Sequence, residues 1–178
     1  MANLVLGPLL RYVGERDATV WVETDAACTV EVRAADVTGS ERTFAVAGHH
    51  YAVVVVDGLA PGSSTPYEVR LDADRVWPLD GSPYPASRIR TVDEARQVRL
   101  VFGSCHEPPD PEAGTEPDVL NAYAIRMASQ AHEEWPDLFL MVGDQVYADE
   151  PSDAVQAWIR GRRDASRPPG LEVADFEE

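Results

Sequence analysis

Two apolar stretches in the second half of the chain are each followed by side chains that can bind a metal ion. Residues 98–102 precede Cys105, and residues 138–142 precede Asp144 and Tyr147. If the two stretches form neighbouring parallel strands about 5 Å apart, their carboxyl ends meet at one sheet edge, where open α/β sheets bind ligands. A thiolate, a carboxylate and a phenol at one edge predict a metal site.

The pattern around these residues predicts the elements that would position them. Residues 98–102 and 138–142 read as strands, and the unbroken apolar run of the second is typical of a strand buried on both faces. Strand, helix and strand make a βαβ unit, which we expect to open an α/β domain over residues 96–178. The intervening helix, which Pro136 would stop, is predicted from apolar residues at helical spacing: Leu120, Ala124, Met127, Ala128, Ala131 and Trp135.

The first half of the chain has the alternating pattern of half-buried strands. We expect a β-sandwich of the fibronectin type III or immunoglobulin-like kind over residues 1–93, with a loop at 77–86. The turn of residues 59–62 (LAPG), followed by Tyr67, resembles the corner of a fibronectin type III domain, in which that tyrosine folds back onto the turn. The expected strands are residues 18–24, 28–33, 50–56, 67–71 and 87–91.

The residues after the two later strands resemble a known enzyme family. The sequence Gly143-Asp144-x-x-Tyr147 resembles the second motif of the calcineurin-like metallophosphoesterases, with the tyrosine found in purple acid phosphatases. Residues 143–149 (GDQVYAD), together with residues 102–105 (FGSC), look most like the alkaline phosphatase D (PhoD-like) family. Members of this family also carry a leading fibronectin-like sandwich, so the resemblance covers essentially the whole chain.

The resemblance implies a dinuclear metal centre that hydrolyses phosphate mono- or diesters. Cys105 would be a thiolate ligand of a ferric ion (Fe3+), and Tyr147 a phenolate ligand. Asp144 would be the catalytic carboxylate that bridges the iron to calcium (Ca2+) or another divalent cation. A trivalent ion can hold a phenol deprotonated well below its usual pKa of about 10. Asp149 and His106 are candidates for orienting these ligands or facing the substrate.

The chain departs from the family pattern in its later motifs. The family's remaining ligands come from Asn, Asp and His clusters, and none of the four histidines here lies in such a context. Residues 171–178 resemble the start of a helix that has been cut. We therefore expect a truncated family member that lacks about half of the metal ligands and is inactive by itself.

Each candidate residue also has a structural interpretation. Cys105 could be a small buried hydrophobe, Asp144 a turn cap, and Tyr147 a packed aromatic. Asp149 could be a solvated loop acid, and His106 could simply face its own loop. A basic cluster contains Arg160, Arg162 and Arg163. The cluster could attract phosphate or could form a solvated helix face, and we favour the solvated helix face.

Composition narrows the classes of protein. The formal net charge of −16, with no lysine, argues against a nucleic-acid-binding face, since phosphate contacts need clustered cations.

No segment has the length and apolarity of a membrane span, and no signal peptide is apparent, so the expected location is the cytoplasm. Cys28 and Cys105 lie in different expected domains, which argues against a disulfide. The sequence indicates no oligomeric state. The alternative function is a non-catalytic binding module built on the sandwich.

Overall fold

The structure is a computed structural model that describes residues 1–106, 118–145, 147–175 and 177–178. Residues 107–117, which are rich in proline and glutamate, lie outside these residues, as do Val146 and Phe176. The chain divides into two compact units, Met1–Gln97 and Val98–Glu178, and each is described by itself.

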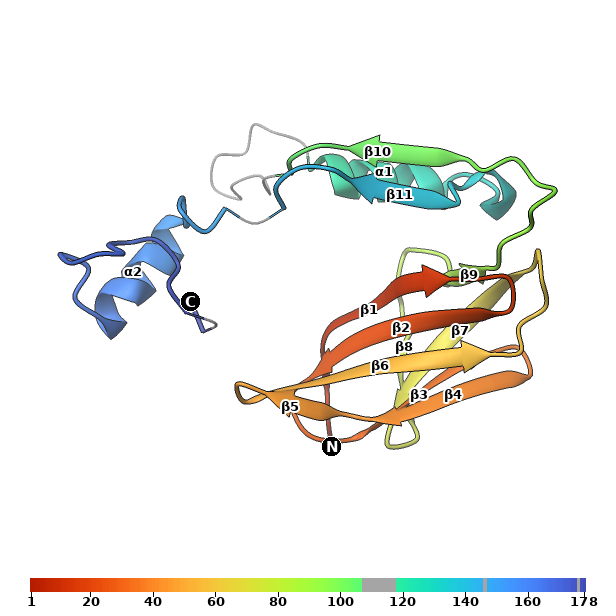
Figure 1. The fold of residues 1–178 in the computed structure, drawn as a ribbon, viewed down its shortest axis with the longest axis horizontal. Helices are drawn as coiled ribbons and strands as arrows, with labels where there is room; N and C mark the ends of the chain where they lie inside the picture. The colour runs from red at the N-terminus through yellow and green to blue at the C-terminus, as the bar shows by residue number, and fades with distance from the viewer. Residues whose placement is uncertain (107–117, 146, 176) are drawn as a thin grey trace. The chain divides into compact units, whose positions relative to one another are not determined.

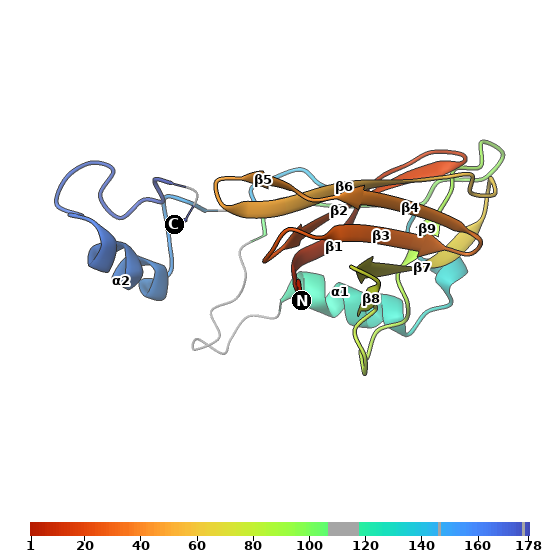
Figure 2. The same ribbon diagram turned by 90° about the horizontal axis from the view of Figure 1, so that it is seen from below.

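The first unit consists of two antiparallel sheets packed face to face, which confirms the expected β-sandwich (Figure 1, Figure 2). In one sheet the strand order is β1-β2-β6-β5, and in the other it is β4-β3-β7-β8, with β9 also pairing with β7. Their bounds are β1 Leu4–Val13, β2 Asp17–Thr24, β3 Thr29–Ala34, β4 Val37–Arg42, β5 Phe44–Val46, β6 His49–Asp57, β7 Ser64–Leu71, β8 Asp74–Trp77 and β9 Arg88–Arg90.

The core of the first unit is formed by alternate residues of the central strands. Val20 of β2, Val32 of β3, Val54 of β6 and Val69 of β7 are all completely buried between the sheets. Burial of each such side chain contributes about 1.5–3 kcal/mol relative to leaving it exposed. Cys28 belongs to this core, as the alternating pattern predicted.

The strands that the sequence pattern did not reveal are all edge strands. β1, β4, β5 and β8 each lie at an end of the strand order in their sheet. An edge strand buries fewer side chains and tolerates proline and polar residues, so the alternating apolar signal is weak. β1 illustrates this, because it contains Gly7 and Pro8 and changes register with β2 between Leu6 and Leu9.

Tyr67 supports the corner of the sandwich through a partner that the fibronectin resemblance did not indicate. Its side chain is buried, and its hydroxyl forms a hydrogen bond with the side chain of Ser87. Burial raises the pKa of Tyr67 to about 12, so the phenol stays neutral at physiological pH. Trp77 donates from Nε1 to the same Ser87 Oγ at 3.2 Å.

In the second unit, two parallel strands are joined through a helix. β10 (Leu100–Gly103) and β11 (Leu138–Met141) pair in register from Leu100 and Leu138 to Gly103 and Met141, with α1 (Val119–Ala128) between them in the chain. The element order is therefore the expected one, while its assignment to a metallophosphatase domain stays a prediction. The unit also contains a 3-10 turn, η1 (His132–Glu134), and a second helix, α2 (Asp153–Arg162).

The two faces of this small sheet differ in how they are covered. Tyr123 of α1 stacks on Phe139 of β11 with ring centroids 6.0 Å apart, so α1 covers that face. Side chains alternate along a strand, which places Leu138 and Leu140, the chain neighbours of Phe139, on the opposite face. That second face is exposed, with Phe102 70% accessible, and it is formed by Leu100, Phe102, Leu138 and Leu140.

The helix before β11 is shorter than its spacing predicted. α1 begins after Asp118, whose side chain accepts from the Asn121 backbone N–H, and it ends at Ala128 rather than near Trp135. The Trp135 indole instead donates to the Met127 carbonyl at 2.7 Å and so caps the helix end. The helix start expected at 171–178 is also wrong, because the described residues there form turns. No helix in the described ranges is long and apolar enough to cross a membrane.

Candidate functional site

The loops that follow β10 and β11 are held together by backbone hydrogen bonds beyond the end of the strand ladder. Val142 N–H donates to the Gly103 carbonyl at 2.9 Å, and His106 N–H donates to the Asp144 carbonyl at 2.9 Å. The side-chain amide of Gln145 adds a hydrogen bond to the Ser104 carbonyl at 3.0 Å. The two loops therefore form one continuous edge, as expected for neighbouring parallel strands.

Cys105 lies at the centre of this edge and contacts both other predicted ligands. Its Sγ accepts a hydrogen bond from the Asp144 backbone N–H at 3.4 Å and another from the Tyr147 side chain. These bonds, with a weaker one from the Ser104 hydroxyl, lower the pKa of the exposed thiol, while the nearby Asp144 carboxylate opposes the shift. These hydrogen bonds thus stabilise the thiolate form of Cys105 relative to that of a free cysteine.

Gly143 makes this close approach possible. A Cβ at position 143 would lie 2.7 Å from Cys105 Sγ and closer still to the Cys105 backbone nitrogen. Any other residue here would have to push the two loops apart. The glycine that precedes Asp144 is therefore required by the contact with the cysteine loop, not by a turn with positive φ.

An open cleft of about 520 Å3 lies beside this edge. Asp144, Tyr147 and Asp149 line one side, and the other side is formed by a later segment containing Glu172 and Val173. The Val173 N–H donates to the Ala148 carbonyl at 2.8 Å, which holds the two sides together. With Glu150 also present, four carboxylates line the cleft, so its field favours cations over anions.

The two residues predicted to support the site differ in their placement. Asp149 lines the cleft. His106 is not among the lining residues; its Nε2 lies 3.4 Å from Asp118 Oδ1, at the start of α1. Its backbone bond to Asp144 joins the loops, but its ring is directed at the helix cap. Whether either residue orients a metal ligand stays a prediction.

The donor set matches a metal centre in type but is small. Thiolate, phenolate and carboxylate donors suit a trivalent ion next to a divalent one. Within the described part of the chain, no group of three or more His, Cys, Asp and Glu side chains is arranged to hold a metal ion. Cys105, Asp144 and Tyr147 therefore stay predicted ligands, and a dinuclear centre would need further donors.

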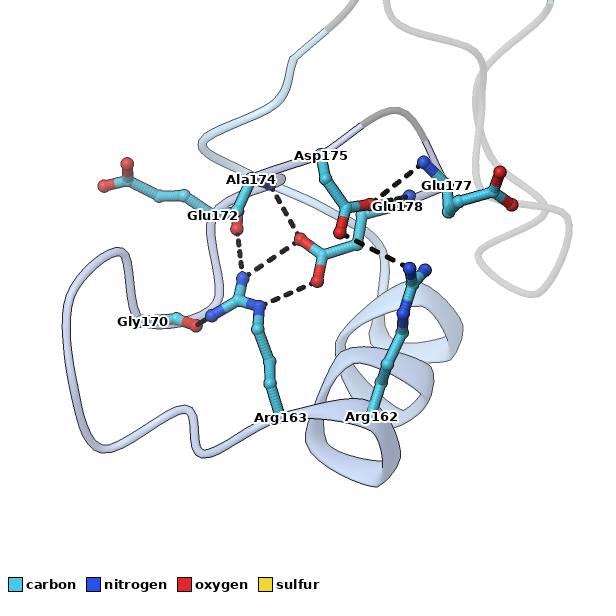
Figure 3. A network of polar contacts seen from close by, with 8 residues as sticks. All are labelled: Arg162, Arg163, Gly170, Glu172, Ala174, Asp175, Glu177 and Glu178. Atoms are coloured by element: carbon cyan, nitrogen blue, oxygen red, sulfur yellow. Dashed lines mark hydrogen bonds and ion pairs between the residues drawn. The ribbon is translucent and has the colours of Figure 1, made fainter. Parts of the chain in front are cut away.

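The three arginines of the basic cluster differ in their placement. Arg160 and Arg162 are exposed on α2, as expected of a solvated helix face, whereas Arg163 is bonded within the fold (Figure 3). Arg163 donates to Gly170 and Glu172 carbonyls, each at 2.7 Å, and pairs with Glu178. Arg162 lies over the Trp158 ring at 4.8 Å and pairs with Asp175 at 3.4 Å. Sequence reasoning missed the roles of Glu172, Val173 and Glu178, and no local pattern marks them.

The comparisons with known proteins agree with this two-part organisation. Residues 1–89, half of the chain, match the family described as Domain of unknown function (DUF7800), and the chain belongs to that family. The chain is similar in fold to a solved structure of PhoD, with a TM-score of 0.53 and 19% sequence identity over 87% of the chain. It spans 29% of the length of that PhoD chain. No curated protein matches the sequence.

Proposed function

We propose that the second unit contributes ligands to a dinuclear metal centre that hydrolyses phosphate mono- or diesters. The observation that carries the proposal is the convergence of Cys105, Asp144 and Tyr147 where two parallel strands end. Cys105 Sγ accepts hydrogen bonds from both of the other two residues. The likeness in fold to PhoD supports the same function.

Each candidate ligand has a chemical role in this proposal. Cys105 as thiolate and Tyr147 as phenolate would be strong anionic donors for Fe3+, and Asp144 would supply a carboxylate for it and for Ca2+ or another divalent cation. Bound metals would supply an activated water and positive charge for the phosphate oxygens. Asp149, on the cleft wall, would orient the site through hydrogen bonds.

The charge of the cleft supports a cation-dependent reaction. The four carboxylates that line it would repel a negatively charged phosphate ester. A substrate of this class could approach only after cations had neutralised the cleft. Asp144 lines the cleft and is also tied to the cysteine loop through its backbone N–H, so its carboxylate is the one expected to hold the cation nearest the substrate.

Three donors from these loops are fewer than two metal ions need. The others must come from water, from substrate or from residues other than those described. We therefore expect the 178-residue polypeptide alone to hydrolyse p-nitrophenyl phosphate and its bis-ester negligibly, because catalysis requires the complete clamp. Robust metal-dependent turnover by this polypeptide would contradict the partial ligand set.

Ferric iron binding to the purified chain tests the proposal. Tyrosinate bound to Fe3+ absorbs visible light, so the iron-loaded chain should be coloured. Tyr147→Phe keeps the ring and should remove the band. Tyr123→Phe is the matched control, because Tyr123 stacks on Phe139 away from the ligand loops and should leave the band intact. An unchanged spectrum and iron content in Tyr147→Phe would overturn the phenolate role.

A second candidate function is a binding module built on the sandwich. It is favoured by an aromatic group on the outer face of the β1-β2-β6-β5 sheet: Tyr51 stacks on Trp21 at 5.7 Å and on His49 at 6.2 Å, beside the exposed Phe44. The function of such a module would not require the three candidate ligands. The iron experiment separates the two functions, since a binding module would retain no ferric ion in any variant.

A further inference from the structure

The cleft owes its second wall to one buried ion pair. Arg163 follows the last residue of α2 and donates from Nε to Glu178 Oε1 at 2.7 Å and from Nη2 to Oε2 at 3.1 Å. The Glu178 side chain is only 1% exposed and that of Arg163 only 23%. Both hydrogen bonds of this partly buried pair are charge-assisted, so each is stronger than a bond between neutral groups.

The same two side chains also bind the backbone of the segment between them. Arg163 donates to the carbonyls of Gly170 and Glu172, and Glu178 accepts from the Ala174 N–H at 2.7 Å (Figure 3). We call the pair, with these backbone bonds, the clasp. It fixes the peptide groups on both sides of Val173, whose N–H reaches the Ala148 carbonyl.

The clasp connects α2 to the candidate site. Glu172 and Val173 line the cleft together with Asp144 and Tyr147. Their segment is bonded to Arg163 through the Glu172 carbonyl and to Glu178 through the Ala174 N–H. The planar guanidinium of Arg163 makes four hydrogen bonds, to the Gly170 and Glu172 carbonyls and to both Glu178 oxygens, whereas a lysine has only three N–H donors on a single nitrogen. Removing it would free the wall without touching a predicted ligand.

We propose that Arg163 and Glu178 are positioning residues for cation binding in the cleft. Through the clasp they hold the Glu172 carboxylate and the Val173 backbone opposite Asp144, so that the cleft is preorganised for a cation. This inference rests on the proposed function, because it assumes that the cleft binds a cation. It predicts that loosening the clasp weakens cation binding even when every predicted ligand is present.

Two measurements on the full chain test it. The first is amide hydrogen exchange at Val173 and Ala174, which reports whether the wall is held. The second is binding of terbium (Tb3+), a luminescent probe for oxygen-rich cation sites, sensitised by Tyr147. Arg163→Lys should accelerate exchange at both amides about tenfold, because it loses charge-assisted hydrogen bonds. It should weaken Tb3+ binding and leave exchange within α2 unchanged.

The matched control is Arg160→Lys, since Arg160 is exposed and, within the described part of the chain, donates to Gln156 of its own helix. It should alter neither measurement. Faster exchange in Arg163→Lys with unchanged Tb3+ affinity would overturn the positioning role and leave the proposed function standing. Failure of the unaltered chain to bind Tb3+ would overturn the cation site itself. Unchanged exchange in Arg163→Lys would show that the clasp does not hold the wall.

Discussion

The backbone N–H of Asp144 donates to Cys105 Sγ at 3.4 Å, although 39 residues separate the two in the sequence. The contact exists because β10 and β11 run parallel and end side by side, and because Gly143 leaves room for the sulfur. It joins the two loops that carry the predicted ligands.

Replacing Gly143 should disrupt the site without removing a ligand. Gly143→Ala places a methyl group against Cys105, and such overpacking typically costs about 1–3 kcal/mol. We expect faster amide exchange at Val142 and His106, whose N–H groups bridge the two loops, and weaker iron binding.

Gly161→Ala is the control for this change. Gly161 lies in α2 with nothing within 4 Å of an added Cβ, and alanine is favoured over glycine in a helix by about 1 kcal/mol. This variant should be as stable as the parent or slightly more so. Equal amide exchange and equal iron binding in Gly143→Ala and Gly161→Ala would mean that the site does not depend on the close approach of the two loops.

Replacing the Asp144 carboxylate should abolish cation binding while keeping the fold. Asp144→Asn retains the backbone N–H that bonds Cys105 but removes the negative charge. A neutral amide bridges two cations poorly, so titrated iron and Tb3+ should be lost. Asp149→Asn, on the cleft wall, should weaken binding only in part. If Asp144→Asn binds cations like the parent chain, Asp144 is a turn residue.

The clasp should respond to acid in a defined direction. Hydrogen bonding from Arg163 lowers the pKa of Glu178 below its ordinary value near 4.5, with the Ala174 N–H and the nearby Arg162 acting in the same sense. A carboxyl with a lowered pKa stabilises the fold fully above its ordinary pKa, and this contribution is lost as the pH falls through the lowered value. Asp175, which pairs with Arg162, is the other carboxylate close by.

Nuclear magnetic resonance can follow this titration. The Ala174 amide, which donates to Glu178 Oε2, should change its chemical shift only as the pH drops below 4.5. Glu178→Gln should abolish that transition. A midpoint above 4.5 would contradict the stabilising ion pair.

The exposed face of the β10–β11 sheet should make the chain associate. Phe102 is 70% exposed beside Leu140, and contiguous apolar faces of this kind bind other apolar surfaces. Phe102→Ser should reduce binding of an apolar dye and should lower self-association in sedimentation. Leu79→Ser is the control, since Leu79 is also exposed but lies in a loop of the first unit. Equal effects of both changes would argue against a specific face.

Local pattern was sufficient for the parts of the fold in which each strand is buried. The alternation in β2, β3 and β7 follows directly from having one face in the core, whereas β6 was predicted from its continuous run of β-branched residues; each strand was predicted to within a few residues. The meeting of Cys105 with Asp144 could also be predicted, because parallel neighbouring strands bring their carboxyl ends to one edge.

Tertiary structure decided what local pattern does not encode. The edge strands were missed because they bury little, and the end of α1 at Ala128 depends on the Trp135 indole folding back onto Met127. The pairing of Arg163 with Glu178, and with it the wall at Val173, has no periodic signature. Those contacts join residues that are brought together only when the second unit folds. In the unfolded chain the same charged and polar groups would bind water instead, so the sequence pattern does not reveal their partners.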